Sequence, residues 1–356
     1  MENRIKTDIL SLTLPELEVF VTEELGEAKY RAKQIFTNIH RGVPPCEITN
    51  LSKALREKID EKCEYRLPTV ERKLVSAIDG TVKYLFRLID GNSIESVVMK
   101  YKHGNTVCIS SQVGCRMGCR FCASTIGGKV RDLTPSELVG QVIAAQNDTG
   151  ERISNIVMMG IGEPLDNFDN VVKFLRLVGC EEGLNIGYRH ISLSTCGIVS
   201  RIYELAELDF PITLSISLHA PDDETRSAIM PINNRWGVDE LLGACRDYYA
   251  KTKRRISFEY TLISGKNDSP ENAERLASVL NGSLRTKKDA FPIHVNLIPV
   301  NEVKETGFER SGGAAIKAFA STLERRGIRA TVRRKLGSDI NASCGQLRRE
   351  AALKKE

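Results

Sequence analysis

Cys-Arg-Met-Gly-Cys-Arg-Phe-Cys occupies residues 115–122 of a chain of 356 residues. It follows a strand-like run at residues 106–110, so the three cysteines are expected in a loop at the end of a strand. Three thiolates held close together can bind a cubane iron–sulfur cluster, and three protein ligands for four irons leave one iron open. Gly114 and Gly118 allow the tight backbone path that such a loop needs.

A structural zinc site is the alternative for these cysteines. Zinc usually takes four Cys or His ligands in two pairs, and no second pair stands at a suitable spacing. Ten cysteines in a cytosolic protein favour metal binding or catalysis over disulfides. We therefore predict a [4Fe–4S] cluster on Cys115, Cys119 and Cys122. The cysteines that we assign to the packed core, all in helix-like segments, are Cys46, Cys63, Cys180 and Cys245.

Strand-like and helix-like segments alternate from residue 106 onward. Thr134-Pro135-Ser136-Glu137 is a capping box that predicts the start of a helix. Strands are expected at residues 106–110, 155–159, 190–194, 212–218, 256–262, 293–299 and 330–334. Repeated βα units form a parallel sheet or barrel whose site lies at the carboxyl ends of the strands. Because six or seven strands fall short of a complete barrel, we predict an α/β fold with a partial (βα)6 barrel.

Two smaller units precede the barrel. Apolar residues at helical spacing predict a helical accessory unit over residues 1–64. Residues 65–105 predict a short antiparallel β extension, since Asp79-Gly80 and Asp90-Gly91-Asn92 are hairpin signals between strand-like runs. The barrel is assigned to residues 106–347 and a basic tail to residues 348–356.

Composition indicates a globular cytoplasmic protein. Hydrophobic residues make up 41% and charged residues 27% of the chain, no apolar run approaches the roughly 18 residues of a membrane span, and the polar N-terminus is no secretory signal. The net charge of +5 permits a nucleic-acid partner without requiring one. Short basic clusters, each more often a solvated surface, gather in the last third: Lys253-Arg254-Arg255, Lys287-Lys288, Arg325-Arg326, Arg333-Arg334-Lys335 and Arg348-Arg349.

The cysteine spacing in a strand-end loop resembles that of the radical S-adenosylmethionine (SAM) superfamily, from about residue 100 to residue 346. The resemblance implies that the open iron binds the amino and carboxylate groups of SAM, and that reduction splits SAM into methionine and a 5′-deoxyadenosyl radical. It also implies SAM contacts near the predicted strand ends, where each residue alone would more often cap or turn the chain. These residues are Gly162, Glu163, Ser194, Ser217, Leu218, His219 and Asn301.

The strand end at residues 159–164, Met-Gly-Ile-Gly-Glu-Pro, has the features such a site needs. A glycine-rich strand end would let the backbone approach a ligand closely. The Glu163 carboxylate could accept a hydrogen bond from an ammonium group.

A closer resemblance rests on residues 107–115, Val-Cys-Ile-Ser-Ser-Gln-Val-Gly-Cys, and 337–347, Gly-Ser-Asp-Ile-Asn-Ala-Ser-Cys-Gly-Gln-Leu. Both runs resemble the RlmN family of adenine C2 methyltransferases, and the resemblance covers nearly the whole chain. It implies an adenosine of the 23S rRNA peptidyl-transferase centre as the target, and the adenosine 3′ of the anticodon in some tRNAs. The related Cfr-type enzymes methylate C8 instead, and no single residue separates the two.

The RlmN resemblance implies two SAM molecules per turnover, because C2 of adenine is electrophilic and cannot attack the methyl group of SAM. One SAM methylates Cys344, and the radical from the second removes a hydrogen atom from that S-methyl group. The carbon radical then adds to C2, Glu95 accepts the C2 proton, and Cys108 attacks Cys344 to release the RNA and leave a disulfide.

The residues themselves leave alternatives open. Cys108 lies in an apparent strand and could be a core cysteine, whereas Cys344 precedes a glycine in a polar segment. Glu95 could face solvent on an amphipathic strand, so its role as a base comes from the resemblance. Cys196 stands where relatives commonly have a small residue such as Ser.

The resemblance also implies 23S rRNA and tRNA as partners and a reductant such as flavodoxin or ferredoxin, and we expect a monomer without membrane contact. From another class, the chain could be a non-catalytic RNA-binding protein with a structural metal. A radical SAM enzyme for a small molecule is a third alternative. The pair Cys108 and Cys344 argues against it, because hydrogen abstraction alone needs neither.

Overall fold

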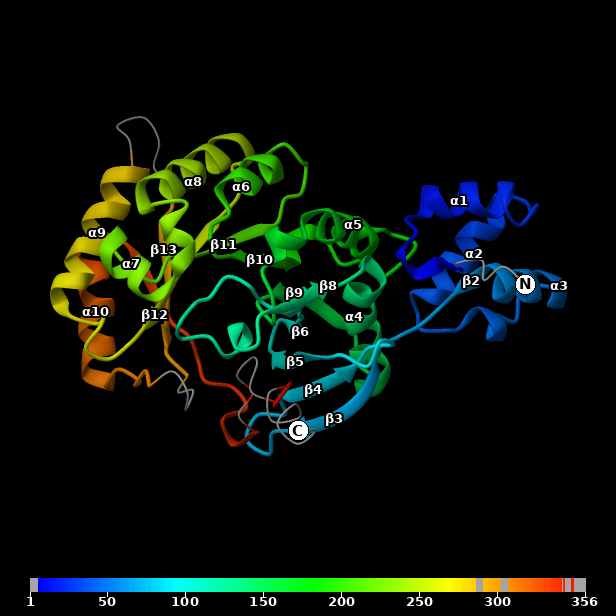
Figure 1. The fold of residues 1–356 in the computed structure, drawn as a ribbon, viewed down its shortest axis with the longest axis horizontal. Helices are drawn as coiled ribbons and strands as arrows, with labels where there is room; N and C mark the ends of the chain where they lie inside the picture. Colours follow the sequence, from blue (N-terminus) through cyan, green and yellow to red (C-terminus); the bar gives the residue numbers. More distant parts are fainter. Residues whose placement is uncertain (1–5, 286–290, 302–306, 341, 343–346, 349–356) are drawn as a thin grey trace.

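A computed structural model describes residues 6–285, 291–301, 307–340, 342 and 347–348. The chain begins with a small helical unit, drawn in blue in Figure 1. Its first long helix starts at a capping box, in which the Thr13 N–H donates to Glu16 Oε2 at 2.8 Å. The unit contains β1 (Thr7–Asp8), η1 (Ile9–Ser11), α1 (Leu14–Glu23), α2 (Tyr30–Ile39), η2 (Pro45–Glu47), α3 (Lys53–Lys62) and β2 (Cys63–Glu64).

Four strands then form an antiparallel meander: β3 (Thr69–Val75), β4 (Val82–Arg87), β5 (Ser93–Tyr101) and β6 (Gly104–Cys108). Glycines with positive φ turn the chain between them, at 70° for Gly80, 81° for Gly91 and 114° for Gly104. The hairpin signals in the sequence are therefore confirmed. The meander is continuous with the central sheet, because β6 also pairs in parallel with β9 (Ile153–Met158).

The central sheet contains seven parallel strands among the described residues. After β6 and β9 come β10 (Ile191–Thr195), β11 (Thr213–Ser217), β12 (Ile256–Leu262), β13 (His294–Pro299) and β14 (Arg329–Val332). Each lies within two residues of its predicted position. The α/β fold with a partial barrel is confirmed, and β14 extends the six βα units by one further strand.

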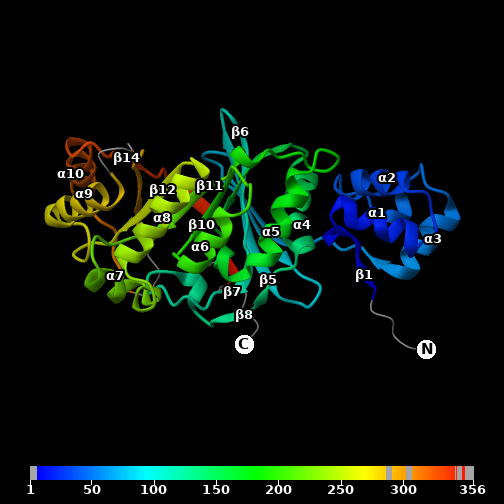
Figure 2. The same ribbon diagram turned by 90° about the horizontal axis from the view of Figure 1, so that it is seen from above.

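Helices surround the outer side of the curved sheet (Figure 1), and Figure 2 shows the same arrangement from above. They are α4 (Pro135–Thr149), α5 (Phe168–Gly179), α6 (Val199–Ala206), α7 (Asp223–Ile229), α8 (Val238–Thr252), α9 (Pro270–Leu284) and α10 (Gly313–Arg325). The capping box at Thr134 and Glu137 starts α4 as predicted. None of the described helices combines the length and apolarity that crossing a membrane requires.

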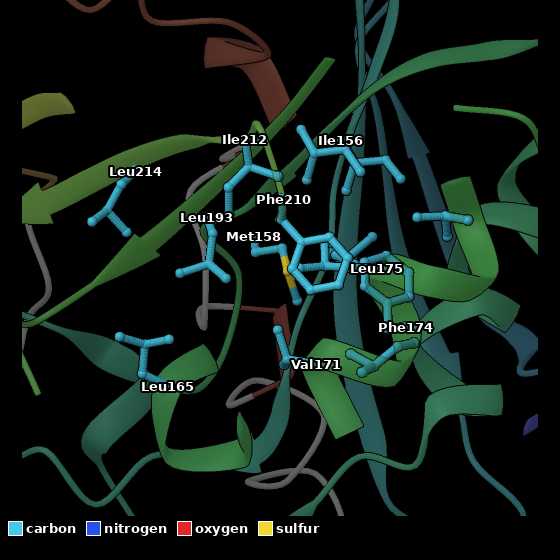
Figure 3. Close-up of a cluster of buried hydrophobic side chains, with 14 of the residues drawn as sticks. Ile156, Met158, Leu165, Val171, Phe174, Leu175, Leu193, Phe210, Ile212 and Leu214 are labelled. Carbon is cyan, nitrogen blue, oxygen red and sulfur yellow. The ribbon is translucent and has the colours of Figure 1, made fainter. Parts of the chain in front are cut away.

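The barrel core lies between the sheet and these helices. Val171, Phe174 and Leu175 recur at helical spacing on α5 and are buried against the sheet residues Ile156 and Leu193 (Figure 3). A fully buried Leu, Phe or Val side chain stabilises the fold by about 1.5–3 kcal/mol.

Four cysteines were predicted to lie in the packed core, and the structure confirms this prediction for some of them. Cys63 and Cys245 are buried, and Cys180 is half-buried at the end of α5. Cys46 is exposed, so its assignment is wrong. It lies on the short η2 segment, which has no helical face to bury.

The N-terminal unit packs against α4 and α5 at one end of the molecule (Figures 1 and 2). At the start of α4, the Ser136 hydroxyl donates to Asp8 Oδ2 at 2.5 Å and the Ser136 N–H donates to Ser11 Oγ at 3.0 Å. After α5, Glu182 pairs with Lys33 of α2 at 3.2 Å. This contact fixes the unit beside the first two βα repeats.

His40 is buried in the same contact region. Its ring lies 4.0 Å from the Phe36 ring, and Nδ1 donates to the Phe36 carbonyl oxygen at 2.9 Å. Nε2 is buried and has no hydrogen-bond partner among the described residues, so a proton there would be an unsolvated charge. Burial lowers the pKa of His40 to about 4.

Acid should therefore weaken the fold through His40. The unfolded chain takes up a proton below about pH 6.5 and the folded chain only near pH 4, so stability falls by about 1.4 kcal/mol per pH unit between these values. Urea unfolding followed by circular dichroism should show His40→Leu losing this slope relative to wild type. At pH 8 the two proteins should differ only by a constant packing contribution. An identical slope in both proteins would contradict the assignment.

Candidate active site

The cysteine loop is held at both ends by a small hairpin. β7 (Gln112–Gly114) pairs antiparallel with β8 (Lys129–Asp132), and the Cys115 N–H donates to the Gly128 carbonyl oxygen at 3.1 Å. Gly114 has φ 79°, and a Cβ there would lie 2.0 Å from that oxygen. Gly118 also has positive φ, at 71°. The two glycines thus have the role predicted from the sequence.

Asp166 anchors the same loop from the next strand end. Its carboxylate accepts hydrogen bonds from Gln112 Nε2 at 2.9 Å and Lys129 Nζ at 3.0 Å, and it pairs with Arg116. Burial alone would raise the pKa of Asp166, but hydrogen bonds from Arg116, Gln112 and Lys129 lower it overall. The charged carboxylate therefore ties the loop to the barrel.

Cys115, Cys119 and Cys122 line a single cavity of about 210 Å³, which we call the cysteine cavity. Burial, with smaller contributions from nearby Glu163, Cys122 and Asp166, raises the pKa of Cys115 to about 12. Thiols in this setting stay protonated unless a cation binds them. The cavity therefore has the donor chemistry of a metal site.

The thiols are not arranged around one ion. Among the described residues, no three Cys, His, Asp or Glu side chains could hold a single metal ion. A cubane cluster requires a different arrangement, because each thiolate binds its own iron. Three thiols that share a cavity therefore fit an iron–sulfur cluster better than a structural zinc ion.

The glycine-rich strand end after β9 packs against the chain that leads into the loop. A Cβ at Gly160 would lie 2.6 Å from the Ile109 carbonyl oxygen, and one at Gly162 would lie 2.6 Å from Gln112 Cβ. Gly162 also lines the cysteine cavity. These glycines therefore permit a close backbone contact within the protein, a role that the sequence reading did not assign to them.

Glu163 lies in the wall of the cysteine cavity and is almost fully buried. Its Oε1 accepts from the Leu165 N–H at 3.0 Å and its Oε2 from the Cys196 N–H at 2.7 Å. Burial raises the pKa of Glu163, and these two N–H groups oppose the rise. The carboxylate is thus held in place with capacity to accept from a ligand ammonium group.

His219 also lines the cysteine cavity, and it is held in a left-handed conformation with φ 58°. Its Nδ1 accepts from the Thr261 N–H at 2.8 Å, and burial lowers the pKa of His219 to about 3. The ring is therefore neutral with its proton on Nε2, which makes Nε2 a hydrogen-bond donor.

The other predicted SAM contacts do not all line the cysteine cavity. Ser194 and Ser217 line the cysteine cavity. Leu218 is fully buried, and its backbone N–H donates to the Glu259 carbonyl oxygen at 3.1 Å. Asn301 is exposed and lines a second, adjoining cavity.

This second cavity, of about 240 Å³, is lined by Cys108, and we call it the Cys108 cavity. Its inner wall is apolar, with Val97 and Met99 of β5 beside Cys108. Its rim is cationic and exposed, formed by Arg310, Arg333, Arg334 and Lys335. The residues that line both cavities are Phe121, Cys122, Met159, Thr261, Ile298 and Arg333. The two chambers therefore share a wall.

Glu95 is on β5, two residues before Val97, and therefore on the same face of the sheet. Only 2% of its side chain is exposed, which excludes the solvent-facing alternative. Its carboxylate pairs with the equally buried Lys83 of β4 at 3.1 Å and accepts from the Arg348 N–H at 2.6 Å. Glu95 is thus a buried carboxylate one strand away from Cys108, since Val97 and Cys108 are paired in register.

Cys344 lies outside the described residues, as do Lys287, Lys288 and nearly all of the basic tail. Several polar residues that line or support the cavities were not predicted from the sequence: Lys83, Arg226 and Glu259. Glu259 and Lys83 do leave a signal, because each is a charged residue within an otherwise strand-like run.

Two family models match the chain. Residues 109–277 match the radical SAM superfamily, and residues 7–65 match the ribosomal RNA large subunit methyltransferase N-terminal domain.

Full-length relatives agree with this division. A Clostridium novyi protein named "Probable dual-specificity RNA methyltransferase RlmN" is 54% identical over 96% of this chain and 98% of its own length. A protein of the same name from Lachnospira eligens is 52% identical over 96% of both chains. The crystal structure of a radical SAM methyltransferase from Sphaerobacter thermophilus superposes with a TM-score of 0.89, at 43% identity over 96% of this chain and 98% of that one.

Breaking the buried Lys83–Glu95 pair should destabilise the protein strongly. Lys83→Met leaves a buried carboxylate without its cation and should lower the free energy of unfolding by about 3–5 kcal/mol. The exposed pair Lys100–Glu151 is the matched control, with side chains 44% and 43% exposed, and Lys100→Met should cost about 0–1 kcal/mol. Adding Glu95→Gln to Lys83→Met should recover part of the loss, as measured by urea unfolding. Equal effects of the two lysine substitutions would contradict this account.

Proposed function

The chain belongs to the RlmN family of dual-specificity radical SAM RNA methyltransferases, and on this premise we propose that it methylates C2 of adenosine in 23S rRNA and tRNA. The targets would be an adenosine of the peptidyl-transferase centre and the adenosine 3′ of the anticodon. The observation that carries the proposal is the pair of adjoining cavities, one lined by three cysteines and the other by Cys108 under a cationic rim.

The cysteine cavity is suited to the cofactors. Cys115, Cys119 and Cys122 would hold the [4Fe–4S] cluster, which with SAM supplies the radical that abstracts hydrogen. Glu163 would accept from the SAM amino group, and the His219 Nε2–H would donate to an acceptor of the same ligand. The backbone hydrogen bonds on both side chains fix their direction, so little rearrangement is needed on binding.

The Cys108 cavity is suited to an extruded base. An enzyme that acts on a base in folded RNA must take it out of the stack, and apolar walls with a polar mouth accept such a base. Val97 and Met99 supply apolar wall, and Arg310, Arg334 and Lys335 can neutralise the neighbouring phosphates.

Cys344 would carry the methyl group as a thioether, after its thiolate attacks the methyl carbon of one SAM. Support comes from the described residues around it. Asp339 accepts from the Ser76 hydroxyl at 2.7 Å, and Ala342 packs beside Cys108. Arg348 donates its backbone N–H to Glu95. Ala342 thus lines the Cys108 cavity two residues before Cys344, and Arg348, four residues after it, bonds Glu95 on the strand next to that of Cys108.

Glu95 and Cys108 would complete the reaction. The adduct formed by radical addition would first lose one electron, for which the oxidised cluster would be the acceptor. The Glu95 carboxylate would then accept the C2 proton, with Lys83 holding the carboxylate in position. The Cys108 thiolate would then attack the Cys344 sulfur, so that a disulfide forms, the sulfur–carbon bond breaks, and the released carbon takes up a proton to become the methyl group. A reductant such as flavodoxin or ferredoxin would supply electrons for the cluster, and two SAM molecules would be used per turnover.

RNA binding would extend beyond the cavity rim. The N-terminal unit and the basic C-terminal segment would contact phosphates away from the target base, and the enzyme would act as a monomer.

The product of the reaction tests the proposal. Anaerobically reconstituted protein should convert unmodified 23S rRNA to 2-methyladenosine, read by mass spectrometry of digested nucleosides, and Cys344→Ala should abolish the product. An 8-methyladenosine product would assign the chain to Cfr-type chemistry. SAM cleavage without any methylated adenosine would overturn the RNA assignment.

Removing the resolving thiol should trap the intermediate. With Cys108→Ala, the Cys344–RNA bond has no thiol to release it, so a covalent protein–RNA adduct should accumulate on a denaturing gel. Cys245→Ala is the matched control, since Cys245 is buried in α8 and lines neither cavity. It should turn over without adduct. Absence of adduct in Cys108→Ala, with cluster and SAM cleavage intact, would rule out this role.

A further inference from the structure

Arg226 on α7 is a fully buried arginine behind the cysteine cavity, with 0% of its surface exposed. Five oxygens accept from its guanidinium, and all five are uncharged. They are Cys196 O at 2.7 Å, Asn233 Oδ1 at 2.9 Å, Leu218 O at 3.1 Å, Ser217 O at 3.2 Å and Trp236 O at 3.5 Å. Such a forked set of donors can fix several backbone segments at once.

The guanidinium joins the ends of two strands that carry predicted SAM contacts. Ser217 ends β11 and Leu218 follows it, and Cys196 follows β10. The Cys196 N–H in turn donates to Glu163 Oε2 at 2.7 Å. Arg226 therefore fixes the backbone of the residue that orients the Glu163 carboxylate.

The same helix also contacts the cysteine loop. The Arg120 N–H, between Cys119 and Cys122, donates to the Ile229 carbonyl oxygen at the end of α7 at 2.9 Å. Met230, whose N–H donates to the Arg226 carbonyl oxygen at 2.7 Å, lines the cysteine cavity. The α7 helix thus connects the loop with the strand ends.

The charge of Arg226 has no direct counter-ion in the described parts of the chain. No carboxylate there lies within salt-bridge distance of the guanidinium, and Asp223 is reached through the side chain of Asn233. A buried cation is costly unless an anion compensates it. Burial lowers the pKa of Arg226, and nearby Cys196 and Cys119 act in the opposite direction. Cys196 lines the cysteine cavity and its carbonyl oxygen accepts from Arg226 at 2.7 Å, so the buried charge lies directly behind that cavity.

We propose that Arg226 is a positioning residue that aligns the SAM-binding strand ends and supplies the counter-charge of the cluster site. A [4Fe–4S]²⁺ cluster on three thiolates has a net charge of about −1, and one-electron reduction makes it about −2. A fixed buried cation favours the more negative state, so Arg226 makes the cluster easier to reduce. The inference rests on the radical SAM part of the proposed function and is independent of the RNA substrate.

Two substitutions separate the charge from the geometry. Arg226→Lys keeps the charge but loses the fork, whereas Arg226→Gln loses the charge. In reconstituted full-length protein without RNA, both should bind SAM at least about tenfold more weakly, read from the change in the EPR signal of the reduced cluster on SAM addition. The midpoint potential should become more negative in Arg226→Gln and stay near wild type in Arg226→Lys.

Arg235→Gln is the matched control. Arg235 lies nine residues after Arg226 in the sequence, and its exposed side chain stacks on Trp236, so the substitution also removes one positive charge. It should keep the wild-type midpoint potential and SAM affinity.

Unchanged SAM affinity in Arg226→Lys would overturn the positioning role. An unchanged potential in Arg226→Gln, or an equal shift in Arg226→Lys, would overturn the counter-charge role. If Arg226→Gln fails to fold, the proposal is tested with Arg226→Lys alone. That variant must then bind SAM more weakly while its midpoint potential stays at the wild-type value. Iron content and thermal melts verify folding, and these measurements remain valid if RNA methylation fails.

Discussion

Close backbone contact between residues 109–112 and 160–162 is the constraint on which the site depends. The Gly160 N–H donates to Ile109 O at 3.0 Å, and Ser111 and Gln112 both donate to Ile161 O, at 2.8 and 3.1 Å. These bonds continue the parallel pairing of β6 and β9 beyond the last strand residues. They require glycine at two positions, because a Cβ would occupy the space of the opposing backbone. As a result the cysteine loop leaves the sheet directly beside Glu163.

Electrostatics then separates the two cavities. Buried acids and thiols dominate the cysteine cavity, with a neutral imidazole from His219. The Cys108 cavity has an apolar interior and a rim of exposed cations. The thiols suit a cationic iron–sulfur core, which becomes net negative once three thiolates bind it, and the exposed cations suit a polyanionic substrate. The two ligands can therefore be close neighbours, with only the shared wall between the cavities in contact with both.

Local signals account for what the sequence could predict. The cysteine spacing, the capping box at Thr134 and the glycine turns depend on neighbouring residues, so the loop, α4 and the meander were predictable. Lys83 and Arg226 were missed because their significance comes from partners 12 and 30 residues away, Glu95 and Cys196. The close packing of Gly160 and Gly162 against residues 109–112 was missed for the same reason, since the partner strand cannot be read from their own segment. Only the folded sheet brings these groups together.

The wall shared by the two cavities also has a consequence for the lifetime of the enzyme. Phe121 and Met159 line both chambers, so a reactive species that crosses from one to the other passes their side chains. These side chains would therefore be among the first to react with a radical that does not reach its substrate. The methionine thioether is the softer and more readily oxidised of the two. Oxidative damage from failed turnovers would therefore accumulate in the wall that the two cavities share.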